Sequence, residues 1–301
     1  MTILVTGATG NVGRLVVRRL VAQGARVRVL TRSPGTARFP DGVEVLGGDL
    51  DDPASLAGAL AGVSRMYLFP VARTARDVVE LAARAGVERI VTLSSGAVTG
   101  GYDTDFHLPV ERAVEGSGLR WTHVRPGEFM LNKLWLWGPS IRAEGVVREP
   151  FPDAAWCPVH EADIADVAAV ALLEDGHHGR AYDVNGPAVI TRREQVDAIA
   201  AATGRPVRLE VVTAGRAREL YRAQGGFAAA NADFLLGFED YSGNAPAAEA
   251  ASTDVAAPSA GVEAAAPVPV ELPTATPVTG RAARTFAEWA RDHAADLRDL
   301  S

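Results

Sequence analysis

Thr6-Gly7-Ala8-Thr9-Gly10-Asn11-Val12-Gly13 is the stretch of sequence that decides the fold. It follows the short apolar run 3–6 and precedes apolar residues at helical spacing, so it joins a predicted strand to a predicted helix. In that context Gly7 permits a tight turn, Gly10 lets the backbone approach a pyrophosphate, and Gly13 lets the helix pack close to the strand. The N-terminus of the helix offers unpaired N–H groups to phosphates. The loop residues that we expect to bind a dinucleotide are Gly7, Thr9, Gly10, Asn11, Val12 and Gly13.

Strand-like and helical segments alternate through the first 125 residues. Short β-branched or apolar runs, typical of buried strands, occur at residues 3–6, 25–30, 43–46, 66–69, 89–93 and 121–124. Helical segments lie at residues 53–60, 74–85 and 105–115. Repeated βα units of this length imply a parallel sheet with helices on both faces. The predicted fold class is therefore α/β, a doubly wound parallel sheet of the Rossmann type with a smaller C-terminal lobe on the substrate side.

The alternation weakens after Pro126, so we place the end of the predicted nucleotide-binding domain, residues 1–128, close to that proline. We assign residues 129–244 and 280–301 to the smaller lobe. The elements predicted after Pro126 are helices at 163–173, 192–203 and 281–300 and a strand at 207–212. The segment 245–279 has 12 alanines and 6 prolines among 35 residues, with four acidic residues and no basic or aromatic one. Because such a tract buries little apolar area, we expect a mobile insertion.

The end of the second predicted strand selects between the two nicotinamide cofactors. A site for NAD(H) places an acid there, against the ribose 2′-hydroxyl. This strand, Val27-Arg28-Val29-Leu30, is followed by Thr31-Arg32-Ser33 and has no acid, whereas Arg32 can pair with a 2′-phosphate. We therefore expect NADP(H) to be preferred over NAD(H). The alternative is that Arg32 is a solvated loop residue.

The composition limits the partners of the chain. Its 301 residues carry 30 Lys and Arg against 37 Asp and Glu, a net charge of −7, so no basic excess is available for nucleic acid. No uncharged apolar run approaches the roughly 20 residues of a membrane span. Cys157 is the only cysteine, which excludes an intramolecular disulfide and a Cys-built metal site, and the scattered histidines predict no metal. We expect a cytoplasmic protein, a monomer or homodimer, that acts on a small molecule and binds neither nucleic acid nor membrane.

Several motifs in a fixed order carry a family resemblance over most of the chain. They are residues 5–13, Gly48-Asp49-Leu50, Leu93-Ser94-Ser95, Arg125-Pro126-Gly127-Glu128-Phe129, Asp163-Ile164-Ala165-Asp166-Val167 and Thr285-Phe286-Ala287-Glu288-Trp289. In this combination the chain resembles the NmrA-like group of the atypical short-chain dehydrogenase/reductase superfamily, which includes NAD(P)H-binding proteins and quinone-reductase-like enzymes. The resemblance implies cofactor contacts at three strand ends: Asp49 and Leu50 at the adenine, Leu68, Phe69 and Pro70 under the cofactor, and Ser94 and Ser95 near the nicotinamide.

The usual catalytic pair of this superfamily is missing from the chain. Typical members use Tyr-x-x-x-Lys, in which the ammonium lowers the pKa of the phenol for proton transfer. Lys133 is the only lysine, and the residue four positions before it is Phe129. At the helix where the pair would lie, the sequence has His107 and Glu111 on one face, as NmrA-like quinone reductases do. Either His107 donates a proton, oriented by Glu111 or Ser95, or His107 and Glu111 form an ordinary i,i+4 pair.

An apolar segment after residue 128 supplies candidate substrate contacts. Phe129, Met130, Trp135 and Trp137 can wall a pocket for a flat apolar substrate, or they can pack in the core. The predicted function is an NADPH-dependent oxidoreductase that transfers hydride to a quinone, an enone or a similar conjugated carbonyl. The alternatives are an NADP(H)-binding redox sensor without turnover, and a non-redox isomerase, dehydratase or cyclase of a biosynthetic pathway.

Overall fold

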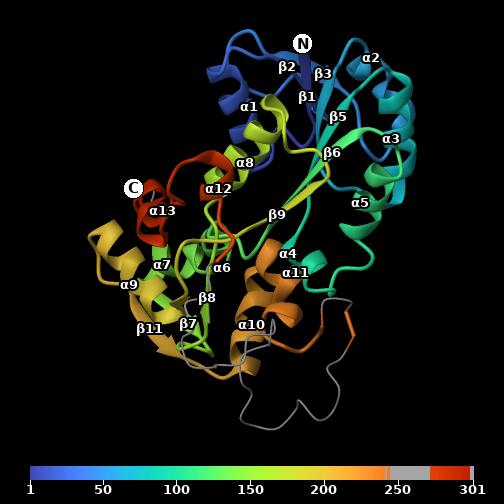
Figure 1. The fold of residues 1–301 in the computed structure, drawn as a ribbon. Coiled ribbons are helices and arrows are strands. Elements are labelled where there is room, and N and C mark those ends of the chain that lie inside the picture. The colour runs from blue at the N-terminus through green and yellow to red at the C-terminus, as the bar shows by residue number, and fades with distance from the viewer. Residues whose placement is uncertain (241–242, 245–271, 299–301) are drawn as a thin grey trace. The chain divides into compact units, whose positions relative to one another are not determined.

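The predicted parallel sheet is present in the computed structural model, which describes residues 1–240, 243–244 and 272–298. Within these residues, seven parallel strands form one sheet in the order β3-β2-β1-β4-β5-β6-β9 (Figure 1). Their bounds are β1 Thr2–Val5, β2 Arg26–Thr31, β3 Glu44–Gly47, β4 Arg65–Leu68, β5 Arg89–Leu93, β6 Arg120–Pro126 and β9 Arg180–Val184. The strand order reverses between β1 and β4, so a ligand crevice is expected at the carboxyl ends of these strands.

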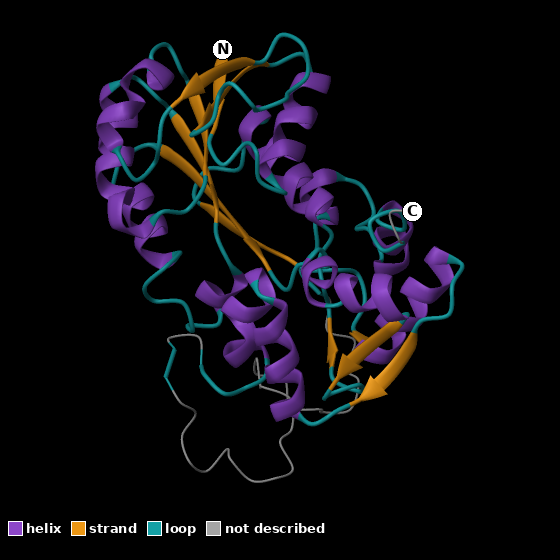
Figure 2. Cartoon of the chain, turned by 180° about the vertical axis from the view of Figure 1, so that it is seen from behind, coloured by secondary structure: helices purple, strands orange, loops and turns teal. Residues whose placement is uncertain are grey.

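Helices cover both faces of this sheet, as the two groups of purple ribbons beside its orange strands show (Figure 2). On one face, α1 (Gly13–Ala22) packs against α8 (Glu161–Leu173). On the other, α3 (Ala75–Arg84) packs against α5 (Leu108–Glu115) over an apolar core. The shorter elements of this unit are η1 Pro53–Leu56, α2 Ala57–Leu60, η2 Ala72–Thr74, α4 Gly96–Thr99 and α12 Thr276–Thr279.

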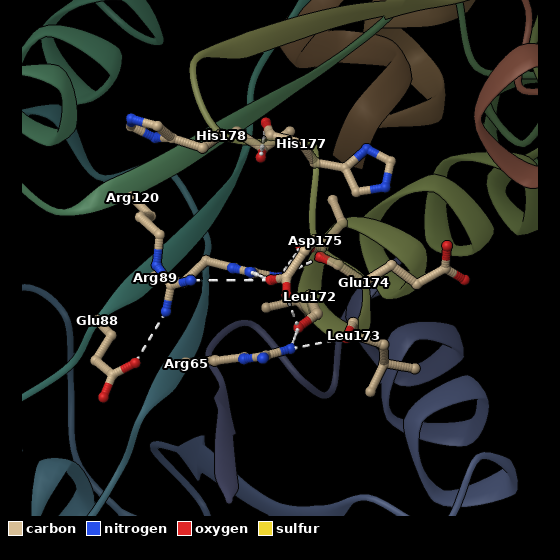
Figure 3. A network of polar contacts seen from close by, with 12 residues as sticks. Arg65, Glu88, Arg89, Arg120, Leu172, Leu173, Glu174, Asp175, His177 and His178 are labelled. Carbon is tan, nitrogen blue, oxygen red and sulfur yellow. Dashed lines mark hydrogen bonds and ion pairs between the residues drawn. The ribbon is translucent and has the colours of Figure 1, made fainter.

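Arginines at the amino ends of β4 and β5 fasten the C-terminus of α8 (Figure 3). Arg89 is buried, and its Nη1 donates to the carbonyl oxygen of Ala171 at 3.1 Å. Arg65 Nη1 donates to the carbonyl oxygens of Leu172 and Leu173, the latter at 2.9 Å. The last turn of a helix leaves its carbonyl groups unpaired and slightly negative. The two guanidinium groups satisfy these carbonyls and hold α8 against the sheet.

A second compact unit has its own apolar core. Its described residues are 128–160, 185–240, 243–244, 272 and 284–298. Its helices are α6 Asn132–Leu136, α7 Gly138–Glu144, α9 Arg192–Thr203, α10 Ala214–Gln224, α11 Gly226–Leu235 and α13 Phe286–Asp292. Its strands are β7 Val146–Glu149, β8 Ala155–Trp156, β10 Ile190–Thr191 and β11 Arg208–Val211. In the part of the chain that the structure describes, no helix is long and apolar enough to cross a membrane.

The domain boundaries differ from the sequence prediction. The unit that contains the sheet comprises Met1–Gly127, Glu161–Val184 and Pro273–Ala283, so α8 and β9 belong to it and not to the smaller lobe. The predicted insertion 245–279 also ends earlier, because Ala275, just before α12, is buried and α12 packs on α8. The remaining part of that prediction, residues 245–271, lies outside the described residues.

The predicted C-terminal helix is also shorter than expected. In place of residues 281–300, α13 covers Phe286–Asp292 and begins with a capping box between Thr285 and Glu288. Turns follow it, although Leu297 is still buried in the core. The helical spacing of Phe286, Trp289, His293 and Leu297 predicted the longer helix; of these residues His293 is half-buried and the other three are buried.

Candidate cofactor and catalytic site

The glycine-rich loop has the close contacts that its sequence predicted. Gly7 has a φ of +58°, and its carbonyl oxygen accepts the N–H of Gly10 at 2.9 Å. A Cβ on Gly13 would lie 2.2 Å from that same oxygen, so a side chain at Gly13 would push α1 away from the loop. Among the described residues, no side chain caps the first turn of α1, and that turn has no acid. The loop and the turn therefore form the anion-binding N-terminus on which a pyrophosphate can rest.

Thr6 joins the carboxyl ends of β1 and β4. Its Oγ1 donates to a carbonyl oxygen of β4 at 3.0 Å and accepts the backbone N–H of Phe69 at 2.8 Å. The Phe69 side chain is 41% exposed and lies against Gly7, where a Cβ would meet Phe69 carbon atoms at 2.9 Å. Leu68 and Pro70, which were predicted with Phe69 to lie under the cofactor, are buried. Phe69 is therefore the member of this trio that is exposed, just after the carboxyl end of β4.

The residues predicted for the adenine side lie at the ends of β2 and β3. Arg32 follows β2, and its side chain is exposed. Asp49 is half-buried, its backbone N–H donates to Ser55 Oγ at 2.9 Å, and its Oδ1 accepts the N–H of Asp51 at 3.0 Å. Leu50 is buried. The Arg32 guanidinium is thus open to solvent at the strand end for which a 2′-phosphate contact was predicted.

His107 lies at the start of α5 and is paired with Asp103. Its Nδ1 lies 2.5 Å from Asp103 Oδ2, while Asp103 Oδ1 accepts the backbone N–H groups of Phe106 at 3.0 Å and of His107 at 2.9 Å. Burial alone would raise the pKa of the Asp103 carboxyl, but the hydrogen bonds from His107 and Phe106 outweigh burial and lower it. From the sequence, Glu111 or Ser95 was predicted to orient the imidazole of His107. In the structure, the residue that contacts the imidazole is Asp103.

Glu111 belongs instead to a buried network at the ends of β5 and β6. Its carboxylate accepts from Ser94 Oγ at 2.5 Å and from Arg125 Nε and Nη2 at 2.9 and 2.6 Å. Burial alone would raise the pKa of Glu111, but the bonds from Arg125 and Ser94 hold it below its ordinary value. Glu111 therefore remains ionised at neutral pH and ties α5 to the strand ends.

The direction of α5 places His107 beyond this network. Four residues separate His107 from Glu111, about 6 Å along a helix axis. Because Glu111 is bonded to Ser94 at the end of β5, His107 lies about one turn further out from the carboxyl edge of the sheet. Ser95, the third residue predicted for catalysis, accepts the N–H of Ala97 at 3.2 Å and caps α4. Of these three residues, His107 lies furthest along α5 toward its N-terminal end, and its side chain is 15% exposed.

Two residues of this site were missed from sequence. Asp103 stands four residues before His107 and Glu111 four residues after it, so spacing does not choose between the two carboxylates. Arg125 was visible within the motif 125–129, but the sequence offered no partner for it.

The predicted substrate residues after residue 128 lie in the second unit. Met130 and Trp137 are each 1% exposed and belong to its core, the second of the two interpretations of that segment. Phe129 and Trp135 are half-buried, and the Trp135 ring centre lies 5.1 Å from that of Phe227.

Lys133 lies in a buried ion-pair network of the same unit. Its Nζ donates to Glu128 Oε1 at 2.6 Å and lies 4.7 Å from the centre of the Trp137 ring. Arg192 Nη1 donates to the same carboxylate at 2.9 Å. Burial would raise the pKa of Glu128, but the two cations lower it to about 2, and burial lowers the pKa of Lys133 to about 8. The only lysine of the chain is therefore bound to a carboxylate in the interior of this unit.

Glu111, Glu115 and His123 lie close enough together to hold a metal ion, since their ligand atoms are within 4.8 Å of one another. His123 is fully buried, and burial lowers its pKa to about 4. The Glu111 oxygens already accept from Arg125, however, and that guanidinium charge opposes a cation at this place. We assign no metal to this group.

The strand order, the glycine-rich loop and the open first turn of α1 define a dinucleotide-binding protein of the Rossmann type. The model of a family described as NAD(P)H-binding matches residues 7–175, more than half of the chain. The chain belongs to this NAD(P)H-binding family.

Relatives of known function are similar over almost the whole chain. It is 40% identical to a (4-alkanoyl-5-oxo-2,5-dihydrofuran-3-yl)methyl phosphate reductase of Streptomyces griseus subsp. griseus, over 97% of this chain and 98% of that protein. It is 34% identical, with the same coverage, to an NAD(P)H azoreductase of Xenophilus azovorans. The chain is accordingly an NAD(P)H-dependent reductase.

Solved structures share the fold. Triphenylmethane reductase of Citrobacter sp., complexed with NADP(H), has 21% identity and a TM-score of 0.73, and the match covers 98% of this chain and 100% of that one. The NADPH-dependent quinone oxidoreductase QOR2 of Escherichia coli, complexed with NADPH, has 24% identity and a TM-score of 0.73, over 96% of this chain and 99% of that one.

Proposed function

We propose that this reductase uses NADPH to reduce a conjugated carbonyl compound, with His107 as the proton donor. The observation that carries the proposal is the place of His107, about one helical turn beyond the Glu111–Ser94 hydrogen bond at the carboxyl edge of the sheet. This is the helix at which the Tyr-x-x-x-Lys pair is missing from the sequence. NADPH, when bound, supplies the hydride. The protein must then orient the acceptor and deliver a proton.

A conjugated acceptor needs little more than that proton. Hydride addition to the far carbon of a C=C–C=O group breaks the carbon–carbon π bond and moves an electron pair to the oxygen, which gives a stabilised enolate. One proton completes the reduction, and an imidazolium can give it because imidazole titrates near neutrality. A saturated ketone would develop a less stabilised alkoxide and would need a stronger proton donor. The absence of the tyrosine–lysine pair therefore favours the conjugated class.

Exposed aromatic side chains near the same strand ends fit a planar acceptor. Phe69 follows β4, whereas Tyr102 and Phe106 lie between α4 and α5, and they are 41%, 48% and 52% exposed. The Phe106 ring is edge-on to His107, with ring centroids 4.7 Å apart. Since aromatic rings stack favourably on other π systems, a planar group on Phe106 would lie beside the imidazole.

The names of the relatives agree with this class of substrate. The Streptomyces relative is named for a 5-oxo-2,5-dihydrofuran ring with an alkanoyl group, in which a C=C bond is conjugated with carbonyl groups. Other relatives are named for azo compounds and quinones. These acceptors share a π system that can hold the electron pair of an added hydride, as the proposal requires.

The test measures NADPH absorbance with a panel of acceptors on the full chain. An acyl-substituted unsaturated lactone and a quinone should oxidise NADPH, whereas a saturated cyclic ketone of the same size should not. The variant His107→Gln should lower kcat by about 100-fold and leave the NADPH Kd unchanged, in line with the usual contribution of a general acid. Tight NADPH binding without oxidation by any acceptor would instead indicate a redox sensor and refute the proposal.

A further inference from the structure

We propose that Asp103 is the positioning residue of this reductase: it holds His107 with the Nδ1 proton toward its carboxylate, so that Nε2 is the atom that transfers the proton. The inference rests on the proposed role of His107 and adds a residue to it. It is carried by the loop between α4 and α5, in which a buried carboxylate contacts the imidazole directly.

The two oxygens of Asp103 have different partners. Oδ1 accepts the backbone N–H groups of Phe106 at 3.0 Å and of His107 at 2.9 Å, and this fixes the plane of the carboxylate. Oδ2 is left to face the ring and lies 2.5 Å from His107 Nδ1. A carboxylate oxygen is an acceptor only, so the ring nitrogen that faces it must carry a proton. Nε2, on the other side of the ring, is then the nitrogen that can give a proton away.

Burial makes this contact stronger than a surface pair. The Asp103 side chain has 0% exposure and that of His107 has 15%, which keeps water from the carboxylate while part of the imidazole stays accessible. The hydrogen bonds from His107 and from the backbone N–H groups lower the pKa of Asp103 despite its burial, so it is ionised at neutral pH. An ionised, buried carboxylate accepts the Nδ1–H of His107 and so fixes the orientation of the ring.

Other charged groups near His107 are directed elsewhere. Glu111, one turn along α5, points its carboxylate at Arg125 and Ser94. Asp105 and Arg112, on the loop and on the next turn, have exposed side chains. In the part of the chain that the structure describes, Asp103 is thus the carboxylate that sets the orientation of His107.

The variant Asp103→Asn removes the negative charge and changes the tautomer of His107, while the side chain keeps nearly the same size and packing. Asparagine keeps Oδ1 for the two backbone N–H groups, so its NH2 group faces His107 Nδ1 in place of Oδ2. That nitrogen must then accept a hydrogen bond, which moves the proton of the neutral ring to Nε2. We expect kcat to fall by roughly 10- to 100-fold. The NADPH Kd should not change.

The matched control is Asp105→Asn, which removes an exposed carboxylate two residues away in the same loop. It should leave kcat unchanged. Equal kcat values for the two variants would overturn the positioning role of Asp103.

Nitrogen-15 NMR of the wild-type histidines supplies a test that does not depend on the stability of a variant. The chain has six histidines, and His107→Gln identifies the signals of His107. The neutral ring should carry its proton on Nδ1, whereas a proton on Nε2 would overturn the inference. Unchanged kcat in His107→Gln would refute the proton donor itself, and the NMR result distinguishes that failure from a failure of the Asp103 contact.

Discussion

Replacement of Arg125 by methionine should destabilise the protein by about 3 to 5 kcal/mol at neutral pH, the usual cost of removing one partner of a buried ion pair. Glu111 is 1% exposed, and Arg125 gives it two of its three side-chain hydrogen bonds. A Coulomb estimate agrees: two unit charges about 4 Å apart at an effective dielectric constant of about 20 interact by about 4 kcal/mol. Because methionine fills much of the volume of arginine, the loss of stability comes mainly from the buried Glu111 carboxylate that is left without a positive partner.

The pH dependence of this loss gives the sharper test. In the wild-type protein the pKa of Glu111 lies below its ordinary value, so the stability from the pair is present at neutral pH and is lost as pH falls through that lowered pKa. In the variant, burial acts without Arg125 and raises the pKa of Glu111, so the carboxyl takes up a proton at a higher pH. The difference in free energy of unfolding between the two proteins should therefore shrink as pH falls from 7 toward 5.

Urea unfolding at both pH values measures the free energies of unfolding. The matched control is Arg112→Met, because Arg112 is an exposed arginine next to Glu111 on α5. The control should cost less than about 0.5 kcal/mol. The double variant Arg125→Met with Glu111→Gln removes the charge as well as its partner and should recover most of the loss at pH 7. A loss in Arg125→Met equal to that of the control, or one independent of pH, would refute the reasoning.

Three further predictions concern the nucleotide loop, the interior lysine and the choice of cofactor. Gly13→Ala should abolish tight NADPH binding in a titration, because its Cβ would lie 2.2 Å from the Gly7 carbonyl oxygen, whereas Gly58→Ala, with open space around it, should leave binding intact. Lys133 should resist acylation in the native protein and react in urea, as peptide mass spectrometry can show; equal rates would contradict its burial. Arg32→Asp should raise the NADPH Kd at least tenfold without raising that of NADH, and Arg38→Asp should have a smaller effect; parallel losses for both cofactors would disprove the 2′-phosphate contact.

The sequence predicted the parts of the fold whose pattern is local. The first six strands of the sheet were expected within a few residues of their bounds, since buried parallel strands are continuous apolar runs. β9 was missed because Arg180-Ala181-Tyr182-Asp183-Val184 is an edge strand with mixed polarity, which among the described strands pairs with β6 alone. β9 and α8 belong to the first unit because they contact segments far away in the sequence. A local sequence pattern cannot predict such contacts.

The candidate site shows the same division between local pattern and tertiary contact. The glycine-rich loop could be predicted because each glycine answers a backbone requirement that no other residue meets, as the +58° φ of Gly7 and the close approach at Gly13 show. The partner of His107 could not, because Asp103 and Glu111 stand at equal spacing from it.

The start of α5 at Leu108 decides between these two carboxylates. Asp103 therefore lies in the loop ahead of the helix, where its Oδ1 accepts the backbone N–H groups of Phe106 and His107, and this turns Oδ2 toward the ring. Glu111 lies inside the helix, where its side chain meets Arg125 of β6 and Ser94 at the end of β5. The sequence spacing of the two residues from His107 is the same, but their positions relative to the helix start differ. Asp103 therefore contacts the imidazole of His107, whereas Glu111 joins α5 to the sheet.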